Sequence, residues 1–323
     1  MRAVVVSERG GPESLAVVDL PTPRPGPGEV VVDVTAAGVN FLDVYQRTGY
    51  YQKPLPFTPG VEGCGLVAAI GPGVNGVGVG DRVGWVLHTG AYAERMVILA
   101  ERLVPVPAEL PDTVAAAGLM HGMAARYLTT STYQVGTSDT VLVHAATGGM
   151  RLLVAQLAKM KGARVIATAA TAELARSAWD AGADAVLLPR EQDIPAQARR
   201  LTGGAGVDVV YDGIGRVSFS TSLACLRPRG TLVLMAELSG RVPAIDPSLL
   251  TVGSFFLTRP VLTHHVARRH ELEAAARDVL TWLGDGTLTP RMGRKYPLEE
   301  AAAAHRDLEA RRDSGKPVIL PQL

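Results

Sequence analysis

A glycine-rich turn carries the clearest chemical signal in the sequence. The apolar run Thr140–His144 is followed by Ala145–Arg151, a turn that contains Gly148 and Gly149. Where such a turn joins a buried strand to a helix, backbone N–H groups and the helix N-terminus can bind a pyrophosphate. A glycine turn can also be a tight connection that binds no ligand. We favour the nucleotide-binding interpretation, because strands and helices alternate after this turn.

A second group of residues could act on a carbonyl substrate. Asp43, Tyr45, Tyr50 and Tyr51 belong to one predicted short helix and the loop that follows it. Such carboxyl and phenol groups can polarise a carbonyl or move a proton. Ordinary packing is the alternative for the tyrosines, which are often half-buried in proteins.

Metal chemistry is not predicted. The chain has two cysteines, Cys64 and Cys225, too few for a four-cysteine zinc site. The pair His264 and His265 has no carboxylate or third ligand at a suitable spacing. We therefore expect no metal site.

Composition narrows the classes of partner. The 323 residues are 47% hydrophobic and carry a net charge of +1, whereas nucleic-acid binders concentrate a basic surplus on one face. The start of the chain lacks the apolar segment of about 7–15 residues that marks a signal peptide. No window approaches the roughly 18 apolar residues of a spanning helix. We expect a cytoplasmic protein that binds a small molecule and has neither a nucleic acid nor a membrane as partner.

The elements that must position these residues are of two kinds. Short β-branched runs separated by Gly/Pro clusters fill the first third, which is typical of a partly open antiparallel barrel. From Thr140 onward, strands and helices alternate, which indicates parallel βαβ units in a doubly wound α/β sheet. We assign residues 1–124 to the barrel domain, 125–262 to a nucleotide-binding-type domain, and 263–323 to a segment that returns to the first domain. Two of the predicted strands are Ala91–Val97 and Val252–Leu257.

Several motifs together resemble those of one family, the NADPH:quinone oxidoreductases. This is the zeta-crystallin-like, zinc-free branch of the medium-chain dehydrogenase/reductase superfamily. The resemblance covers the whole chain, and its motifs are Gly38–Tyr51, Pro59–Gly65, Val79–Val83, His144–Gly149, Gly206–Gly215, Cys225–Gly230, Phe256–Pro260 and Lys295–Arg311.

The resemblance implies a fold, ligands and an assembly. It implies a GroES-like catalytic domain, a Rossmann domain, and a cleft between them for NADPH and a quinone or enone. It also implies a homodimer formed by pairing of an edge strand near Gly253–Leu257. Zinc enzymes of the superfamily place cysteine and histidine ligands where this chain has Gly38, Asn40 and Gly60–Glu62, so the resemblance implies no zinc.

The candidate site residues come partly from this resemblance and partly from the residue types themselves. Asn40 and Tyr45 match positions that face the nicotinamide and the substrate, and Asp43, Tyr51 and Glu237 complete the catalytic candidates. The candidates for cofactor binding are Gly148, Gly149, Arg151, Arg176 and Arg311.

The chain departs from the family pattern around the cofactor. Arg151 stands where the family has a third glycine, so its side chain must enter the dinucleotide groove or push the helix away. Leu174 and Pro189 replace a lysine and a tyrosine near the 2′-phosphate, and Ala124 and Glu237 replace a threonine and an asparagine near the nicotinamide. No carboxylate follows the second strand of this domain to select NAD instead. These changes predict weak or absent NADPH binding, unless Arg176 substitutes for the missing lysine.

These residues are compatible with three functions. The main expectation is an enzyme that acts on a quinone or α,β-unsaturated carbonyl, polyketide-like compound without a cofactor, by proton transfer, isomerisation, cyclisation or conjugate addition. The alternative is an ordinary NADPH-dependent quinone or enone reductase. The third possibility is a non-catalytic dimeric binding protein.

Overall fold

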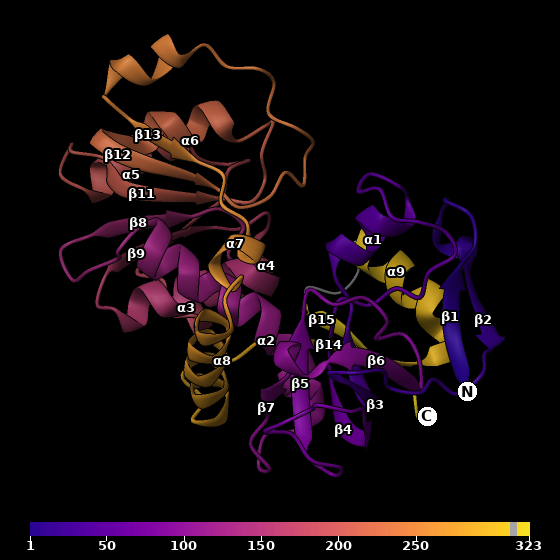
Figure 1. Ribbon diagram of the computed structural model, residues 1–323. Coiled ribbons are helices and arrows are strands. Elements are labelled where there is room, and N and C mark those ends of the chain that lie inside the picture. Colours follow the sequence, from indigo (N-terminus) through magenta and orange to yellow (C-terminus); the bar gives the residue numbers. More distant parts are fainter. Residues whose placement is uncertain (311–314) are drawn as a thin grey trace. The chain divides into compact units, whose positions relative to one another are not determined.

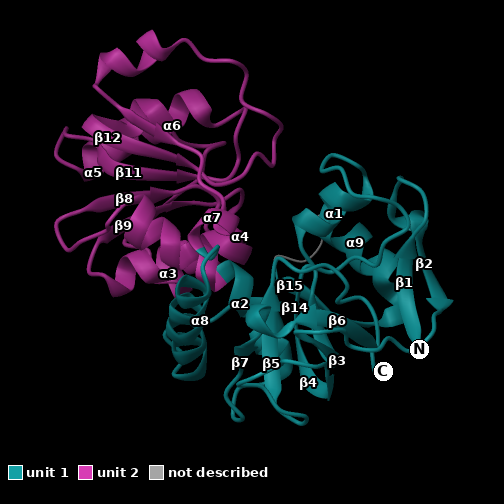
Figure 2. Ribbon diagram, viewed as in Figure 1, with its two compact units in different colours: residues 1–121, 266–323 teal, residues 122–265 magenta. Residues whose placement is uncertain are grey.

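The computed structural model describes residues 1–310 and 315–323, and it divides into two compact units. One unit consists of residues 1–121 and 266–323, and the other of residues 122–265 (Figure 2). The boundaries expected from the sequence, after residues 124 and 262, lie close to these bounds. The predicted architecture, a barrel-like unit interrupted by a doubly wound parallel sheet, is confirmed.

The first unit is built on a seven-stranded sheet in the order β14-β15-β3-β4-β5-β7, with β6 pairing β3. A separate antiparallel pair, β1 and β2, precedes it. Buried valines such as Val30, Val32 and Val34 alternate along β3 and pack with Trp85 and Tyr92 in one core. The strands are β1 (Arg2–Val6), β2 (Leu15–Asp19), β3 (Glu29–Gly38), β4 (Glu62–Ile70), β5 (Arg82–Val86), β6 (Arg95–Leu99), β7 (Val104–Pro105), β14 (Met292–Pro297) and β15 (Lys316–Leu320).

Helices complete this unit. The α-helices are α1 (Phe41–Arg47), α2 (Asp112–Tyr127, which crosses into the second unit), α8 (Arg269–Gly284) and α9 (Ala301–Ala310). The 3₁₀ helices are Pro12–Ser14, Ala100–Arg102 and Leu298–Glu300.

The second unit is a six-stranded parallel sheet in the order β10-β9-β8-β11-β12-β13. Helices α3 and α4 pack together on one face, and α5 and α6 pack together on the other (Figure 1). The strands are β8 (Thr140–Val143), β9 (Arg164–Thr168), β10 (Ala185–Leu187), β11 (Val207–Asp212), β12 (Leu226–Leu234) and β13 (Phe256–Thr258). The helices are α3 (Gly149–Met160), α4 (Ala172–Asp180), α5 (Ile194–Leu201), α6 (Phe219–Cys225) and α7 (Leu262–His265), with a π-helix at Leu128–Thr132 and a 3₁₀ helix at Pro247–Val252.

The strand order creates a switch point between β8 and β11. The chain runs outward from β8 through β9 to β10, and then returns to the opposite side of β8 to form β11. The connections therefore leave the carboxyl ends of β8 and β11 in opposite directions. Ligands of open α/β sheets bind in the crevice at such a point.

Two predicted strands are misplaced. The extended run predicted at Val252–Leu257 is a 3₁₀ helix up to Val252, followed by β13 from Phe256. Ser254, with φ of 51°, turns the backbone out of the extended conformation between them. The strand predicted at Ala91–Val97 is shifted to β6, because pairing with β3 fixes its register.

Among the described residues, no helix is both long enough and apolar enough to cross a membrane.

Candidate functional site

The glycine turn lies at the switch point and leads into a twelve-residue helix, α3. Gly148 is the N-cap of α3 and carries no side chain that could accept from the first-turn N–H groups. Gly149 begins the helix with φ of 56°, a conformation that favours glycine. The positive end of the α3 dipole therefore faces the crevice, and Gly148 gives it no side-chain cap.

Arg151, in the first turn of α3, reaches across to the loop that follows β11. Its Cδ lies 3.1 Å from the position that a Cβ on Gly213 would occupy. The helix still packs on the sheet, because Leu152, Leu153 and Leu157 are buried. The Arg151 side chain thus turns toward the carboxyl end of β11, while α3 keeps its apolar face buried.

The loop beneath Arg151 is held by a buried carboxylate. Asp212 Oδ1 accepts from the backbone N–H groups of Ile214 at 2.7 Å and Gly215 at 3.1 Å. Its Oδ2 accepts from the hydroxyl groups of Ser218 and Ser222, each at 2.7 Å. These contacts fix the surface against which the arginine packs. Sequence reasoning missed Asp212, although a buried strand that ends in aspartate before Gly-x-Gly is a visible signal.

A threonine and a histidine fix the other side of the turn. Thr168 Oγ1 accepts from the Ala145 N–H at 2.9 Å, so its proton can be donated to His144 Nδ1 at 3.3 Å. Burial lowers the pKa of His144, which keeps the ring neutral. His144 is therefore a core histidine.

Glu237, expected to add negative charge near the cofactor, has its charge matched. Its Oε2 accepts from Arg259 Nη2 at 2.8 Å, and its Oε1 accepts from the Val242 N–H at 3.1 Å. Because the carboxylate is paired with a guanidinium, it adds little net charge to the loop.

The carboxyl end of β9 is different. Thr171 is the N-cap of α4, and its hydroxyl oxygen accepts from the Leu174 N–H at 3.3 Å. Glu173 lies in the first turn of α4, and Arg176 is exposed on the next turn. Pro189, in the loop after β10, is also exposed. The remaining candidate for cofactor binding, Arg311, lies outside the described residues.

The first unit holds a buried polar cluster around Asn40. Lys316 Nζ donates to Asn40 Oδ1 at 2.6 Å and to Glu62 Oε2 at 2.7 Å, and Asn40 Nδ2 donates to Glu62 Oε2 at 3.1 Å. Glu62 Oε1 accepts from the Met120 N–H at 2.6 Å. All three side chains are buried, so the Asn40 amide has a single orientation. Sequence reasoning missed Lys316, although a lysine beginning the apolar run Lys316–Leu320 is a detectable signal.

Asp43 is also buried and holds the start of α1. It accepts from the N–H groups of Asn40 at 2.8 Å and Val61 at 3.1 Å, and from the Tyr92 hydroxyl at 3.2 Å. Burial raises the pKa of its carboxyl to about 7, against the effect of these donors. Its contacts give it a role in positioning α1.

A chain of hydrogen bonds continues from Asp43. Arg47 Nη1 can only donate, so it donates to His305 Nδ1 at 3.0 Å, which leaves the His305 proton on Nε2. Nε2–H then donates to the Tyr92 oxygen at 3.1 Å, and the Tyr92 O–H donates to Asp43. Burial, with Arg47, lowers the pKa of His305 to about 3. Arg47 is itself paired with Glu309 at 2.7 Å.

The tyrosines form one aromatic group at the end of α1. The Tyr45 ring centroid lies 5.0 Å from that of Tyr50 and 5.6 Å from that of Tyr51. Tyr45 is half-buried, while Tyr50 and Tyr51 are 43% and 44% exposed. Sequence spacing thus correctly brought these three rings together, and their hydroxyl-bearing rings remain partly accessible.

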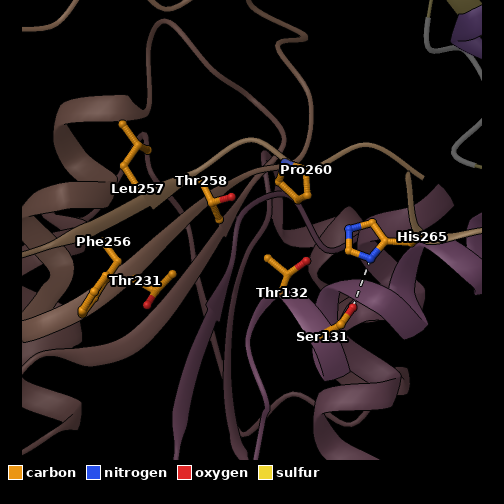
Figure 3. Close-up of a pocket in the computed structure, with 8 residues that line it drawn as sticks. All are labelled: Ser131, Thr132, Thr231, Phe256, Leu257, Thr258, Pro260 and His265. Carbon is orange, nitrogen blue, oxygen red and sulfur yellow. Dashed lines mark hydrogen bonds between the residues drawn. The ribbon is translucent and has the colours of Figure 1, made fainter. Parts of the chain in front are cut away.

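A cavity of about 430 Å³ lies elsewhere, at the β13 edge of the second unit (Figure 3). His265 faces it, stacks on Tyr127 at 4.1 Å, and shares a hydrogen bond with Ser131 at 3.1 Å. None of the site residues predicted from the sequence lines this cavity. Its lining is Ser131, Thr132, Thr231, Phe256, Leu257, Thr258, Pro260 and His265.

Two protein-family models match the chain. The model described as alcohol dehydrogenase GroES-like domain matches residues 26–137, and the one described as zinc-binding dehydrogenase matches residues 149–280. Within the part of the chain that the structure describes, no group of three or more histidine, cysteine, aspartate or glutamate side chains could hold a metal ion.

Individual proteins match over nearly the whole chain. A 2-haloacrylate reductase of Burkholderia sp. is 40% identical, with 99% of each chain covered. The structure of a mycobacterial protein complexed with NADPH is 45% identical, with a TM-score of 0.94 over 99% of this chain and 100% of that one. The structure of the Escherichia coli quinone oxidoreductase complexed with NADPH is 36% identical, with a TM-score of 0.95 and the same coverage.

Proposed function

This chain belongs to the zinc-free quinone oxidoreductase branch of the medium-chain dehydrogenase/reductase family, and from that premise we propose that it is an NADPH-dependent reductase. Its substrate is a quinone or another electron-poor alkene conjugated to a carbonyl or carboxyl group. NADPH, when bound, supplies a hydride. The similar 2-haloacrylate reductase and quinone oxidoreductase support this substrate class.

The observation that carries the proposal is the open, positively charged N-terminus of α3 at the switch point. Gly148 and Gly149 would hold the pyrophosphate through backbone N–H groups, and Arg151 would neutralise part of its charge. The residues present fit a dinucleotide, since Arg151 packs over Gly213 while Leu152 and Leu153 of α3 stay buried. Arg176 and Arg311 are our further candidates for binding the cofactor.

The expectation of cofactor-independent chemistry rested on five replacements near the cofactor, and two of them no longer argue against NADPH binding. The five are Arg151, Ala124, Leu174, Pro189 and Glu237. Arg151 adds a cation at the α3 N-terminus, and Arg259 compensates Glu237. The NADPH complexes of similar proteins favour the reductase.

On the substrate side, we propose that the Tyr45 and Tyr51 hydroxyls contact the substrate carbonyl, with Asn40 at the nicotinamide. The partial exposure of the tyrosine group supports this role for the tyrosines. Lys316 and Glu62 orient Asn40, and Asp43 positions α1. We keep Glu237 as a residue that shapes the loop beside the cofactor.

We also propose a homodimer in the cytoplasm. The edge strand β13 offers unpaired backbone along one side, and Phe256 on it is 62% exposed. Light scattering of the purified protein tests the dimer.

The proposal is tested by NADPH oxidation and binding. Purified protein is expected to bind NADPH at micromolar concentrations and to oxidise it in a saturable manner with a benzoquinone or 2-chloroacrylate. Gly148→Asp places a carboxylate at the pyrophosphate position while supplying a favourable N-cap, so it should abolish binding and leave the fold intact. Absence of any fluorescence change or thermal shift with millimolar NADPH would refute the proposal.

A further inference from the structure

We propose that this chain discriminates little between NADPH and NADH. Its site binds the pyrophosphate that both share, and its described residues hold no fixed cation for the 2′-phosphate that separates them. The inference rests on the proposed function. The N-termini of α3 and α4 lie at the same edge of one sheet, and each would meet a different part of the cofactor.

The α3 end is suited to an anion. Gly148 provides no side-chain cap, and the first turn carries Arg151 and no acidic residue. Arg151 is half-buried against Gly213, which limits the conformations of its guanidinium. A phosphate here gains the helix dipole and a charge-assisted bond. The pyrophosphate is identical in the two cofactors, so this energy does not distinguish them.

The α4 end, which follows β9, is suited to neither 2′ group. In a doubly wound sheet, this is where an arginine accommodates the 2′-phosphate of NADP or a carboxylate binds the ribose hydroxyl of NAD. Here the loop reads Ala169-Ala170-Thr171, with neither. Thr171 caps the helix itself, and Glu173 in the first turn opposes a phosphate.

The cations nearest in sequence are exposed. Arg176 lies on the second turn of α4 and Arg190 in the loop after β10, and both face solvent. Exposed ion pairs contribute little, corresponding to about fivefold or less in affinity. Buried charge-assisted bonds contribute roughly ten- to a hundredfold. The described residues at this edge therefore predict a small preference for NADPH.

The experiment compares dissociation constants for NADPH and NADH, measured by nicotinamide fluorescence at one ionic strength. We expect the two constants to differ by less than about tenfold in the wild-type protein. Arg151→Gln should raise both dissociation constants by the same factor and leave the ratio between them unchanged. Ala170→Arg, at an exposed loop residue, should increase the affinity for NADPH alone by at least about tenfold. The uncharged control Ala170→Gln should not increase it.

Three outcomes would overturn the inference. One is a preference for either cofactor above tenfold in the wild type. Another is a selective loss of NADPH affinity above tenfold in Arg176→Ala or Arg190→Ala. The third is an Ala170→Arg variant that leaves the ratio unchanged. If neither cofactor binds, the proposed function fails as well. If both bind but one is preferred by more than tenfold, only the inference about selectivity fails.

Discussion

Arg151 and Gly213 form a complementary pair across the carboxyl ends of β8 and β11: the arginine Cδ packs 3.1 Å from where a Cβ on residue 213 would stand. The glycine missing from the α3 turn is thus matched by a glycine on the facing loop, which gives the longer side chain its room. The arginine then adds a positive charge at the helix end that already attracts anions.

Restoring the missing glycine should weaken the binding of NADPH. In Arg151→Gly, the dissociation constant for NADPH is expected to rise about tenfold, because one charge-assisted interaction with the pyrophosphate is lost. Isothermal titration calorimetry measures it. Tighter binding in this variant would mean that the arginine obstructs the groove.

The Glu237–Arg259 ion pair should affect NADPH binding, because Arg259 neutralises the Glu237 carboxylate. Removing the cation in Arg259→Ala leaves the Glu237 carboxylate uncompensated beside the loop that Gly215 belongs to, where it repels phosphate. We expect NADPH affinity to fall by several-fold and the double variant Arg259→Ala/Glu237→Gln to recover it. Equal loss in the double variant would show that Arg259 acts by itself.

The buried pair Lys316–Glu62 should be costly to break. The two side chains are 2% and 0% exposed, so Lys316→Met leaves an unpaired buried carboxylate and lowers the free energy of unfolding by about 3–5 kcal/mol. Denaturant unfolding measures the loss. The exposed pair Lys159–Asp184 provides the control, since Lys159→Met should cost less than about 1 kcal/mol. Similar losses in the two variants would contradict the burial argument.

Asp43 and His305 should give opposite pH dependences of stability. The pKa of Asp43 is raised from 3.8 to about 7, so between these values the folded state binds one more proton than the unfolded state. The stability that Asp43 contributes is therefore lost as pH rises through this range. His305 has its pKa lowered from 6.5 to about 3, so the unfolded state binds the extra proton, and stability is lost as pH falls. Each effect amounts to at most about 1.4 kcal/mol per pH unit.

The two effects nearly cancel between about pH 4 and 6.5, and single variants separate them. Relative to wild type, the stability of Asp43→Asn should rise with pH in this window, and that of His305→Gln should fall. Urea unfolding at several pH values gives both slopes. Slopes of the same sign in the two variants would contradict these assignments.

Local pattern predicted most of the fold, because alternation of strands and helices and the Gly/Pro clusters are visible within short windows. The α3 turn and the grouping of Tyr45 with Tyr51 were found in the same way. The contacts of Asn40 were not, because Lys316 reaches it from 276 residues away and nothing local links them. The position of Arg151 depended likewise on Gly213, a residue on a different loop. The strand predicted at Val252–Leu257 begins only at Phe256, because Ser254 takes a left-handed conformation that we did not predict from the sequence.

Isotope labelling shows whether a hydride passes from NADPH to the substrate. NADPH deuterated at the transferred C4 position is incubated with the protein and an α,β-unsaturated carbonyl compound, and the product is analysed by mass spectrometry. Hydride transfer from NADPH gives a reduced product that carries one deuterium on the β-carbon, formed in step with NADPH consumption. An isomerised, cyclised or adduct product without deuterium, formed at the same rate when NADPH is omitted, would contradict it.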